Sequence, residues 1–209
     1  MDNGIFTATA YTKSAQIHYT AEICELVPTD CFSLENKEIF RKLCAEGCAN
    51  YKMKWSCPPY SPSFCDFTSD WNKLYVLYMR VSTEQFPYIK NDYLKIKAAN
   101  SILKSRADKF LRKLSIHYGH YISTGSCRLC KPCKCKKDAP CAHPNEMTYS
   151  FESLGIDVSG LINMCFKNPL LWYKPQSLPK YTSVVCGLLT NEVLSTEFLE
   201  DEYFKCINN

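Results

Sequence analysis

The sequence contains no long hydrophobic run and only a small excess of positive charge. Its longest apolar stretches, Leu74–Met79 and Val184–Leu189, are much shorter than the roughly 20 residues that cross a bilayer, so no membrane span is expected. The N-terminal residues show no basic start followed by an apolar stretch, so we expect no secretory signal and a cytoplasmic location. The chain has 25 basic and 21 acidic side chains, and a net charge of +4 gives no reason to expect a nucleic-acid partner.

Several catalytic and binding motifs are also missing. The sequence has no Gly-rich phosphate loop, no serine nucleophile elbow and no HExxH zinc motif. Aromatic residues make up 13% of the chain, but they are not interleaved with basic residues as a single-strand stacking platform requires. These absences leave the catalytic residues unknown, and the sequence does not decide whether the protein is an enzyme.

Cysteine, in contrast, is abundant, with fourteen residues in 209. Cysteines stand at positions 24, 31, 44, 48, 57 and 65, then at 127, 130, 133, 135 and 141, and finally at 165, 186 and 206. A chain of this length and composition can bury a core without disulfides, and closely spaced cysteines in a reducing compartment indicate metal binding. The distribution predicts one α/β domain, residues 1–209, with cysteine-rich metal-binding insertions at about 44–65 and 125–144.

The apolar pattern between the cysteines predicts the scaffold. Asn91–Tyr118 has an apolar stripe in steps of three and four, which predicts one long helix, and a further helix is expected at Asn36–Ala45. Thr196 is expected to cap a last helix, and a short helix is expected after the second cysteine group. Strands are expected at Gln16–Val27, Trp71–Val81, His120–Gly125 and Tyr181–Leu189. This order predicts a mixed α+β sandwich with a mixed sheet.

The second cysteine group has the spacing of an iron–sulfur site. Cys127, Cys130 and Cys133 follow one another at two-residue intervals, so a tight loop can direct three sulfurs at one small volume. A [4Fe–4S] cluster needs this arrangement because each iron takes one thiolate. Cys141 is the expected fourth ligand, and Cys135 is its nearer competitor.

Zinc is the alternative at the same place. A structural zinc site usually draws on two separated C-x2-C pairs, and Cys127, Cys130, Cys141 and His143 approximate such a set. The surrounding basic side chains would offset the charge of metal-bound thiolates, or would bind an acidic partner. They are Arg128, Lys131, Lys134, Lys136 and Lys137.

The first cysteine group has a less specific spacing. Cys44, Cys48 and Cys57 provide three sulfurs, with Cys65 as a possible fourth, and two prolines follow Cys57. A second metal site with three cysteines would keep an open coordination position. The alternatives are that these cysteines complete the other site or pack as small apolar residues.

Two stretches resemble a family of predicted metal-binding proteins, domain of unknown function 2284. The first is Cys-x3-Cys-x2-Tyr-x3-Trp-Ser-Cys-Pro-Pro, at 44–59, and the second is Gly-Ser-Cys-Arg-Leu-Cys-x2-Cys-x7-Cys, at 125–141. A Ser-x-Glu-x-x-Gly-Ile-Asp-Val stretch follows at 150–158. The chain departs from the family pattern at Ala142 and at Thr148–Tyr149, and Cys135 is an extra cysteine. The resemblance implies a metal, in keeping with iron–sulfur, and implies no particular reaction.

These observations predict a cytoplasmic iron–sulfur protein that transfers electrons or performs a redox reaction with a partner protein or a small-molecule substrate. One alternative is a zinc-binding structural or interaction module. Another is an iron–sulfur enzyme of lyase, hydratase or sulfur-transfer type, in which an open iron acts as a Lewis acid. A secreted disulfide protein is the third and weakest alternative. No nucleic acid and no membrane is expected as a partner.

Overall fold

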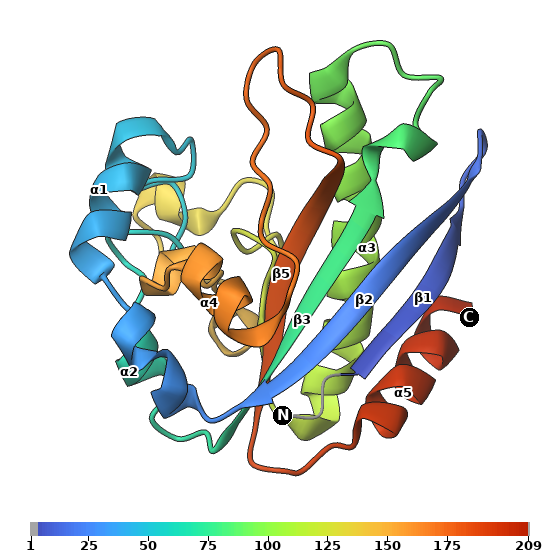
Figure 1. Ribbon diagram of the computed structural model, residues 1–209. Coiled ribbons are helices and arrows are strands. Elements are labelled where there is room, and N and C mark those ends of the chain that lie inside the picture. Colours follow the sequence, from blue (N-terminus) through green and yellow to red (C-terminus); the bar gives the residue numbers. More distant parts are fainter. Residues whose placement is uncertain (1–3, 209) are drawn as a thin grey trace.

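The core of the protein is a five-stranded sheet, seen in a computed structural model that describes residues 4–208 (Figure 1). The strands lie in the order β1-β2-β3-β5-β4, and every neighbouring pair is antiparallel. Their bounds are β1 Gly4–Tyr11, β2 Gln16–Leu26, β3 Lys73–Ser82, β4 His120–Ile122 and β5 Tyr181–Thr190.

Helices cover both faces of this sheet. The α-helices are α1 Lys37–Gly47, α2 Phe64–Thr68, α3 Asp92–Tyr118, α4 Val158–Cys165 and α5 Thr196–Asn208. Short 3-10 helices are η1 Pro28–Leu34, η2 Thr83–Gln85, η3 Lys134–Lys137, η4 Pro144–Glu146 and η5 Glu152–Leu154. Helices α3 and α5 pack on one face, while α4, α2 and η1 lie on the other (Figure 1).

The central strand β3 shows why both faces must be covered. Its run of apolar residues is buried almost throughout, as expected for a strand between two layers. Successive side chains point to opposite faces, so Tyr75, Leu77 and Met79 join the cluster under α3, whereas Leu74 and Val76 join the cluster under α4.

Helix α3 follows the apolar stripe that its sequence predicts. Seven of its side chains are buried against the sheet and α5, from Ile96 to Leu114 in steps of three and four. Asn91 caps the helix by accepting a hydrogen bond from the Leu94 N–H at 3.0 Å. Within residues 4–208, neither this helix nor any other is long and apolar enough to cross a membrane.

The mixed α/β class is confirmed, but three details of the expected fold are wrong. The sheet is antiparallel throughout rather than mixed, because no crossover helix joins two parallel neighbouring strands. The expected elements also omit β1, whose alternating Phe6, Ala8 and Ala10 are buried against the same core as α5. The last helix is capped by Ser195, which accepts from the Phe198 N–H, and not by Thr196.

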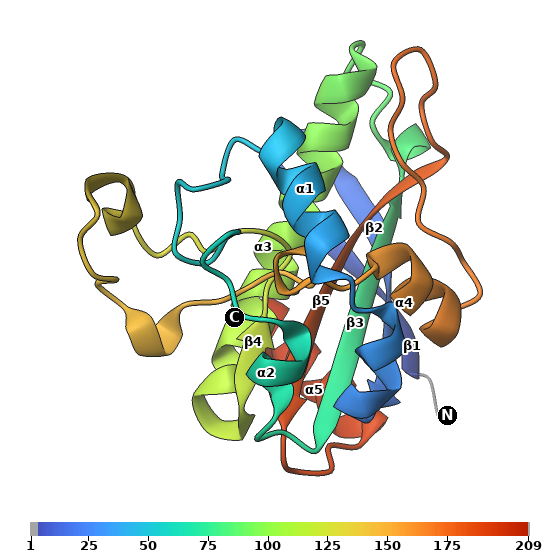
Figure 2. The ribbon, with the colours of Figure 1, turned by 90° about the vertical axis from the view of Figure 1, so that its left-hand side faces the viewer.

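Both cysteine-bearing loops lie on the α1 side of the molecule. The loop after α1 carries residues 48–63, and the loop after β4 carries residues 123–149. Figure 2 shows the second loop extending away from the sheet, with its base beside the first loop. The sheet therefore brings together two segments that are about 70 residues apart in the chain, as the 71-residue separation of Ser56 and Cys127 shows.

Candidate metal centre

The four cysteines of the second group line one small cavity. Cys127, Cys130, Cys133 and Cys141 share about 290 Å³ of empty space, which includes some open solvent. The remaining wall is formed by Trp55, Ser56, Leu129, His143 and Met147. The loop thus gathers the four residues expected to hold a cluster, although their role as ligands stays a prediction.

The first cysteine segment holds this loop in place. Ser56 Oγ accepts a hydrogen bond from the Cys127 N–H at 3.1 Å. Lys54 Nζ donates to Ser126 Oγ at 2.9 Å and to the Cys127 carbonyl at 2.8 Å. Trp55 Nε1 donates to the Ala139 carbonyl at 3.0 Å. Three consecutive residues therefore fix both ends of the loop between Cys127 and Cys141.

The thiols of this group influence one another. Desolvation raises the pKa of the Cys130 thiol, and the nearby thiols of the other three cysteines raise it further. The Lys134 ammonium acts in the opposite direction. A thiol must lose its proton to bind a metal, so bound metal cations would replace these protons. The cations would also offset the electrostatic repulsion among four neighbouring thiolates.

Two further candidate ligands from the same loop, Cys135 and His143, differ in whether they line the cavity. Cys135 is buried, and its Sγ is directed at the Lys52 carbonyl at 3.6 Å instead of lining the cavity. His143 does line the cavity, and its Nδ1 is 3.5 Å from Glu146 Oε1. Cys141 is therefore better placed than Cys135 as the fourth cysteine.

The three cysteines of the first group also lie near one another. Cys44 belongs to α1 and Cys48 directly follows it, with its N–H donating to the Cys44 carbonyl at 3.0 Å. Burial raises the pKa of the Cys44 thiol, and the neighbouring Cys48 thiol and Glu152 carboxylate raise it further. Burial likewise raises the pKa of Cys57 to about 11, and the nearby thiols of Cys48 and Cys44 contribute. Cys65, in contrast, is exposed on α2.

Ser56 connects the two groups. Its Oγ lies 3.9 Å from Cys57 Sγ while it accepts the hydrogen bond from the Cys127 N–H. The side chain is only 1% exposed, so no solvent layer separates the two groups here. This proximity depends on how two loops pack, and the spacing of cysteines along the chain carries no sign of it.

The structure also brings together three cysteines that the sequence leaves scattered. Cys24 on β2, Cys31 on η1 and Cys165 on α4 are all buried in the apolar cluster under α4. A hydrogen bond between the two thiols lowers the pKa of Cys24 and raises that of Cys165, while burial raises the pKa of Cys31 to about 12. Their apolar surroundings are those of cysteines that pack as small hydrophobic side chains.

The four thiols are not drawn together around a single point. Thiolates around one tetrahedral zinc lie about 3.8 Å apart, given the usual zinc–sulfur distance. Across residues 4–208, no three His, Cys, Asp or Glu side chains are gathered closely enough to hold one metal ion. Four cysteines do line one small cavity, which is the number that a cluster with one thiolate per iron requires.

Taken together, the fold and the site define a cysteine-rich α/β protein with thiols arranged for metal binding. The model of a family described as predicted metal-binding protein (DUF2284) matches residues 27–189, which include both cysteine groups. The chain belongs to this family, as the two motifs at 44–59 and 125–158 predict. No curated protein and no solved structure matches the chain.

Proposed function

We propose that this metal-binding protein is an iron–sulfur protein that takes part in electron transfer or a redox reaction coupled to a partner. Cys127, Cys130, Cys133 and Cys141 would hold a [4Fe–4S] cluster. The observation that carries this proposal is the single cavity shared by these four side chains. Their two-residue spacing favours a cluster over zinc, because a structural zinc site usually draws on two separated C-x2-C pairs.

The walls of the cavity suit such a cluster. Trp55, Leu129 and Met147 are large side chains that limit the access of water to the four thiols. The Ser56 hydroxyl, which lines the cavity, and the Lys54 ammonium orient the backbone at Cys127. Limited solvent and nearby hydrogen-bond donors are the features by which a protein sets the potential of a cluster, and a bound cluster would supply one-electron chemistry at this place.

We extend the proposal to a second metal centre at the first cysteine group, whose three side chains would have to draw together around the metal. The Cys48 thiol is close enough to Cys44 to raise its pKa, and both thiols contribute to the raised pKa of Cys57. A metal held by three cysteines keeps one coordination position for a substrate, which is the requirement of the alternative enzymatic function. Ser56 contacts both groups, so electrons would cross a single buried residue between them.

The surface next to the second group suggests the kind of redox partner. Lys131, Lys134, Lys136 and Lys137 are all exposed on the loop that carries the four cysteines. A concentration of positive charge at a redox centre speeds encounters with a negatively charged partner. We therefore expect an acidic electron-transfer protein to bind over this loop.

Metal and acid-labile sulfide analysis of anaerobically purified protein tests the proposal. We expect about four iron and four sulfide per chain if only the second group is occupied, and about eight of each if both groups hold clusters. The visible spectrum should show the broad brown absorption of such clusters. Stoichiometric zinc without sulfide would contradict the proposal and favour a structural zinc module.

A further inference from the structure

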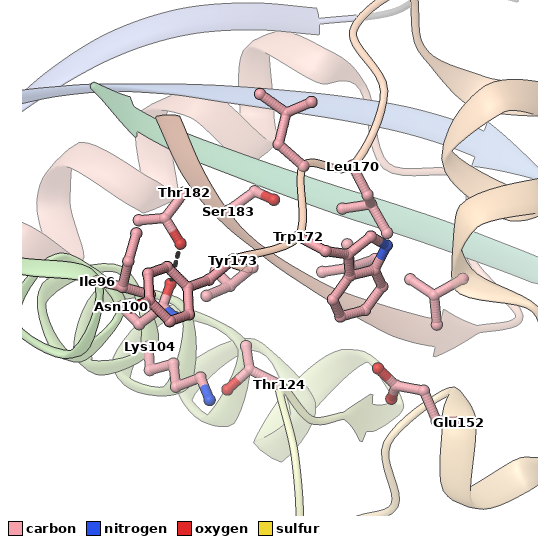
Figure 3. Close-up of a pocket in the computed structure, with 14 residues that line it drawn as sticks. Ile96, Asn100, Lys104, Thr124, Glu152, Leu170, Trp172, Tyr173, Thr182 and Ser183 are labelled. Carbon is pink, nitrogen blue, oxygen red and sulfur yellow. Dashed lines mark hydrogen bonds between the residues drawn. The ribbon is translucent and has the colours of Figure 1, made fainter. Parts of the chain in front are cut away.

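A second cavity opens beside the first cysteine group. Its volume is about 310 Å³, at the lower end of the range for small-molecule sites. Figure 3 shows its walls, which come from α3, from β5 and from residues 170–173 of the segment that precedes β5. Thr124 and Glu152 also line the cavity, so it lies next to the base of the cysteine loop.

One positive charge in this cavity lacks a partner. Lys104 is half-buried on α3 and forms no hydrogen bond or ion pair with any residue between 4 and 208. Desolvation lowers the pKa of its ammonium, and the guanidinium of Arg128 lowers it further, against the smaller effect of Glu152. An anionic group placed here would relieve both unfavourable effects.

Further hydrogen-bond donors lie beside Lys104. Asn100, one turn earlier on α3, accepts from Thr182 Oγ1 through its Oδ1 at 2.7 Å, so its NH₂ group stays available to a ligand. The Thr124 hydroxyl lines the same end of the cavity. Three donors, two from α3 and one from the start of the cysteine loop, therefore line the same cavity and are available to an acceptor.

The cavity also has a large apolar and aromatic part, beside the polar Glu152, Thr182 and Ser183. Ile96, Val158 and Leu170 form its sides, and Trp172 and Tyr173 extend over it from the segment before β5. Trp172 is 64% exposed, a large apolar surface that a ligand body could cover. The ring of Tyr173 is supported by Tyr93, with the ring centroids 6.0 Å apart.

We propose that this cavity binds a small carboxylic acid with an aromatic or branched apolar body. The carboxylate is bound by the Lys104 ammonium and the Asn100 amide, and the body lies against Trp172. A single lysine with two neutral donors suits a monoanion. Phosphate sites ordinarily use an arginine, and no arginine is among the described residues that line this cavity.

The far end of the bound acid would face the first cysteine group. Glu152 lines the cavity, and its carboxylate is close enough to the Cys44 thiol to raise the pKa of that thiol. A hydroxyl or amino group on the acid could donate to Glu152 at this end. The cavity is therefore placed to present a small acid to the first cysteine group. The binding proposal itself does not depend on a metal being bound there.

Calorimetric titration of phenylacetate and of indole-3-acetate into anaerobically purified protein tests the proposal. We expect at least one of these acids to bind, and Lys104→Gln to weaken that binding by about tenfold or more, as the loss of a charged hydrogen bond predicts. The matched uncharged amide of the bound acid should bind unmodified protein more weakly by a similar factor. Trp172→Ala should also weaken binding, through loss of the apolar contact.

Lys109→Gln is the control variant, because Lys109 lies exposed on the same helix and is near Cys206 on the α5 side. It should bind the acid as well as unmodified protein does. An equal loss of affinity for the acid in both lysine variants would overturn the proposal. So would the absence of binding of either acid up to about 10 mM. Metal content measured on the same samples keeps this outcome separate from the iron–sulfur proposal, since Lys104→Gln should retain its metal.

Discussion

At the scale of single residues, Ser56 shows how a small side chain organises the candidate metal centre. Its buried hydroxyl accepts from the Cys127 N–H and contacts the Cys57 thiol. Lys54 and Trp55, the two residues before it, hold the same loop through backbone carbonyls. The short segment Lys54–Cys57 thus supplies a candidate ligand to one group and the supporting hydrogen bonds of the other.

The ligand assignment leads to a prediction for single cysteines. Cys130→Ser should lower the metal content by about four iron per chain, because a cubane that loses one of its four thiolates is poorly held. Iron and sulfide analysis of the purified variant measures this loss. Cys65→Ser is the matched control, since Cys65 is exposed on α2 and does not line the cavity of the four cysteines, and it should leave the iron of that cavity unchanged. Equal iron in the two variants would refute the assignment.

At the scale of elements, the connection between α3 and β4 places the start of the cysteine loop. Helix α3 ends at Tyr118 and β4 begins at His120, so Gly119 alone makes the turn. Its φ of 152° and its closeness to β5 leave no space for a side chain. The pairing of β4 with β5 then directs the chain from Ile122 into the loop that carries the four cysteines.

Gly119→Ala should therefore be strongly destabilising. An added Cβ would lie 1.8 Å from the Leu189 carbonyl oxygen, so the backbone of β4 or β5 would have to move. We expect a loss of more than about 3 kcal/mol in the free energy of unfolding, measured by denaturant titration.

Gly47→Ala offers the opposite case in the same experiment. Gly47 is the last residue of α1, and a Cβ there would meet no atom within 4 Å. Alanine has the higher helix propensity, so the variant should be as stable as the unmodified protein or more stable by up to about 1 kcal/mol. Similar destabilisation by both substitutions would contradict the role given to Gly119.

At the scale of the whole molecule, the scaffold and the cysteine loops have different sources of stability. The sheet is buried between two apolar clusters, one under α3 and α5 and one under α4. The tip of the second loop, in contrast, consists largely of exposed lysines and short 3-10 helices, with Cys135 its buried side chain between residues 128 and 147. Metal binding would supply the stability that this loop does not obtain from a core.

Removal of the bound metal should therefore affect the loop far more than the sheet. Under anaerobic chelation we expect amide hydrogen exchange to speed up by on the order of tenfold or more across residues 125–147, with little change in β3 and β5. Mass-spectrometric exchange on the metal-loaded and metal-free protein measures both regions in one experiment. Uniform loss of protection in the sheet would show that the metal supports the whole fold instead.

Local pattern in the sequence was enough to predict the long helix, four of the five strands and the loop of four cysteines. The stripe of α3 and the two-residue spacing of Cys127, Cys130 and Cys133 each lie within one element or one loop, where separation along the chain sets separation in space. Strand β1 was missed because its alternating side chains are mainly small alanines, which give a weak hydrophobic signal.

Only the tertiary structure decided which of these local features meet. The contact of Ser56 with Cys127, the cavity around Lys104 and the burial of Cys24 beside Cys165 all join segments from different strands and loops. Such contacts depend on the order of strands in the sheet and on how the loops pack over it, and both follow from the burial of the whole apolar surface. The sequence by itself therefore determined what kind of site this protein builds, and the packing of its sheet and loops determined what lies beside that site.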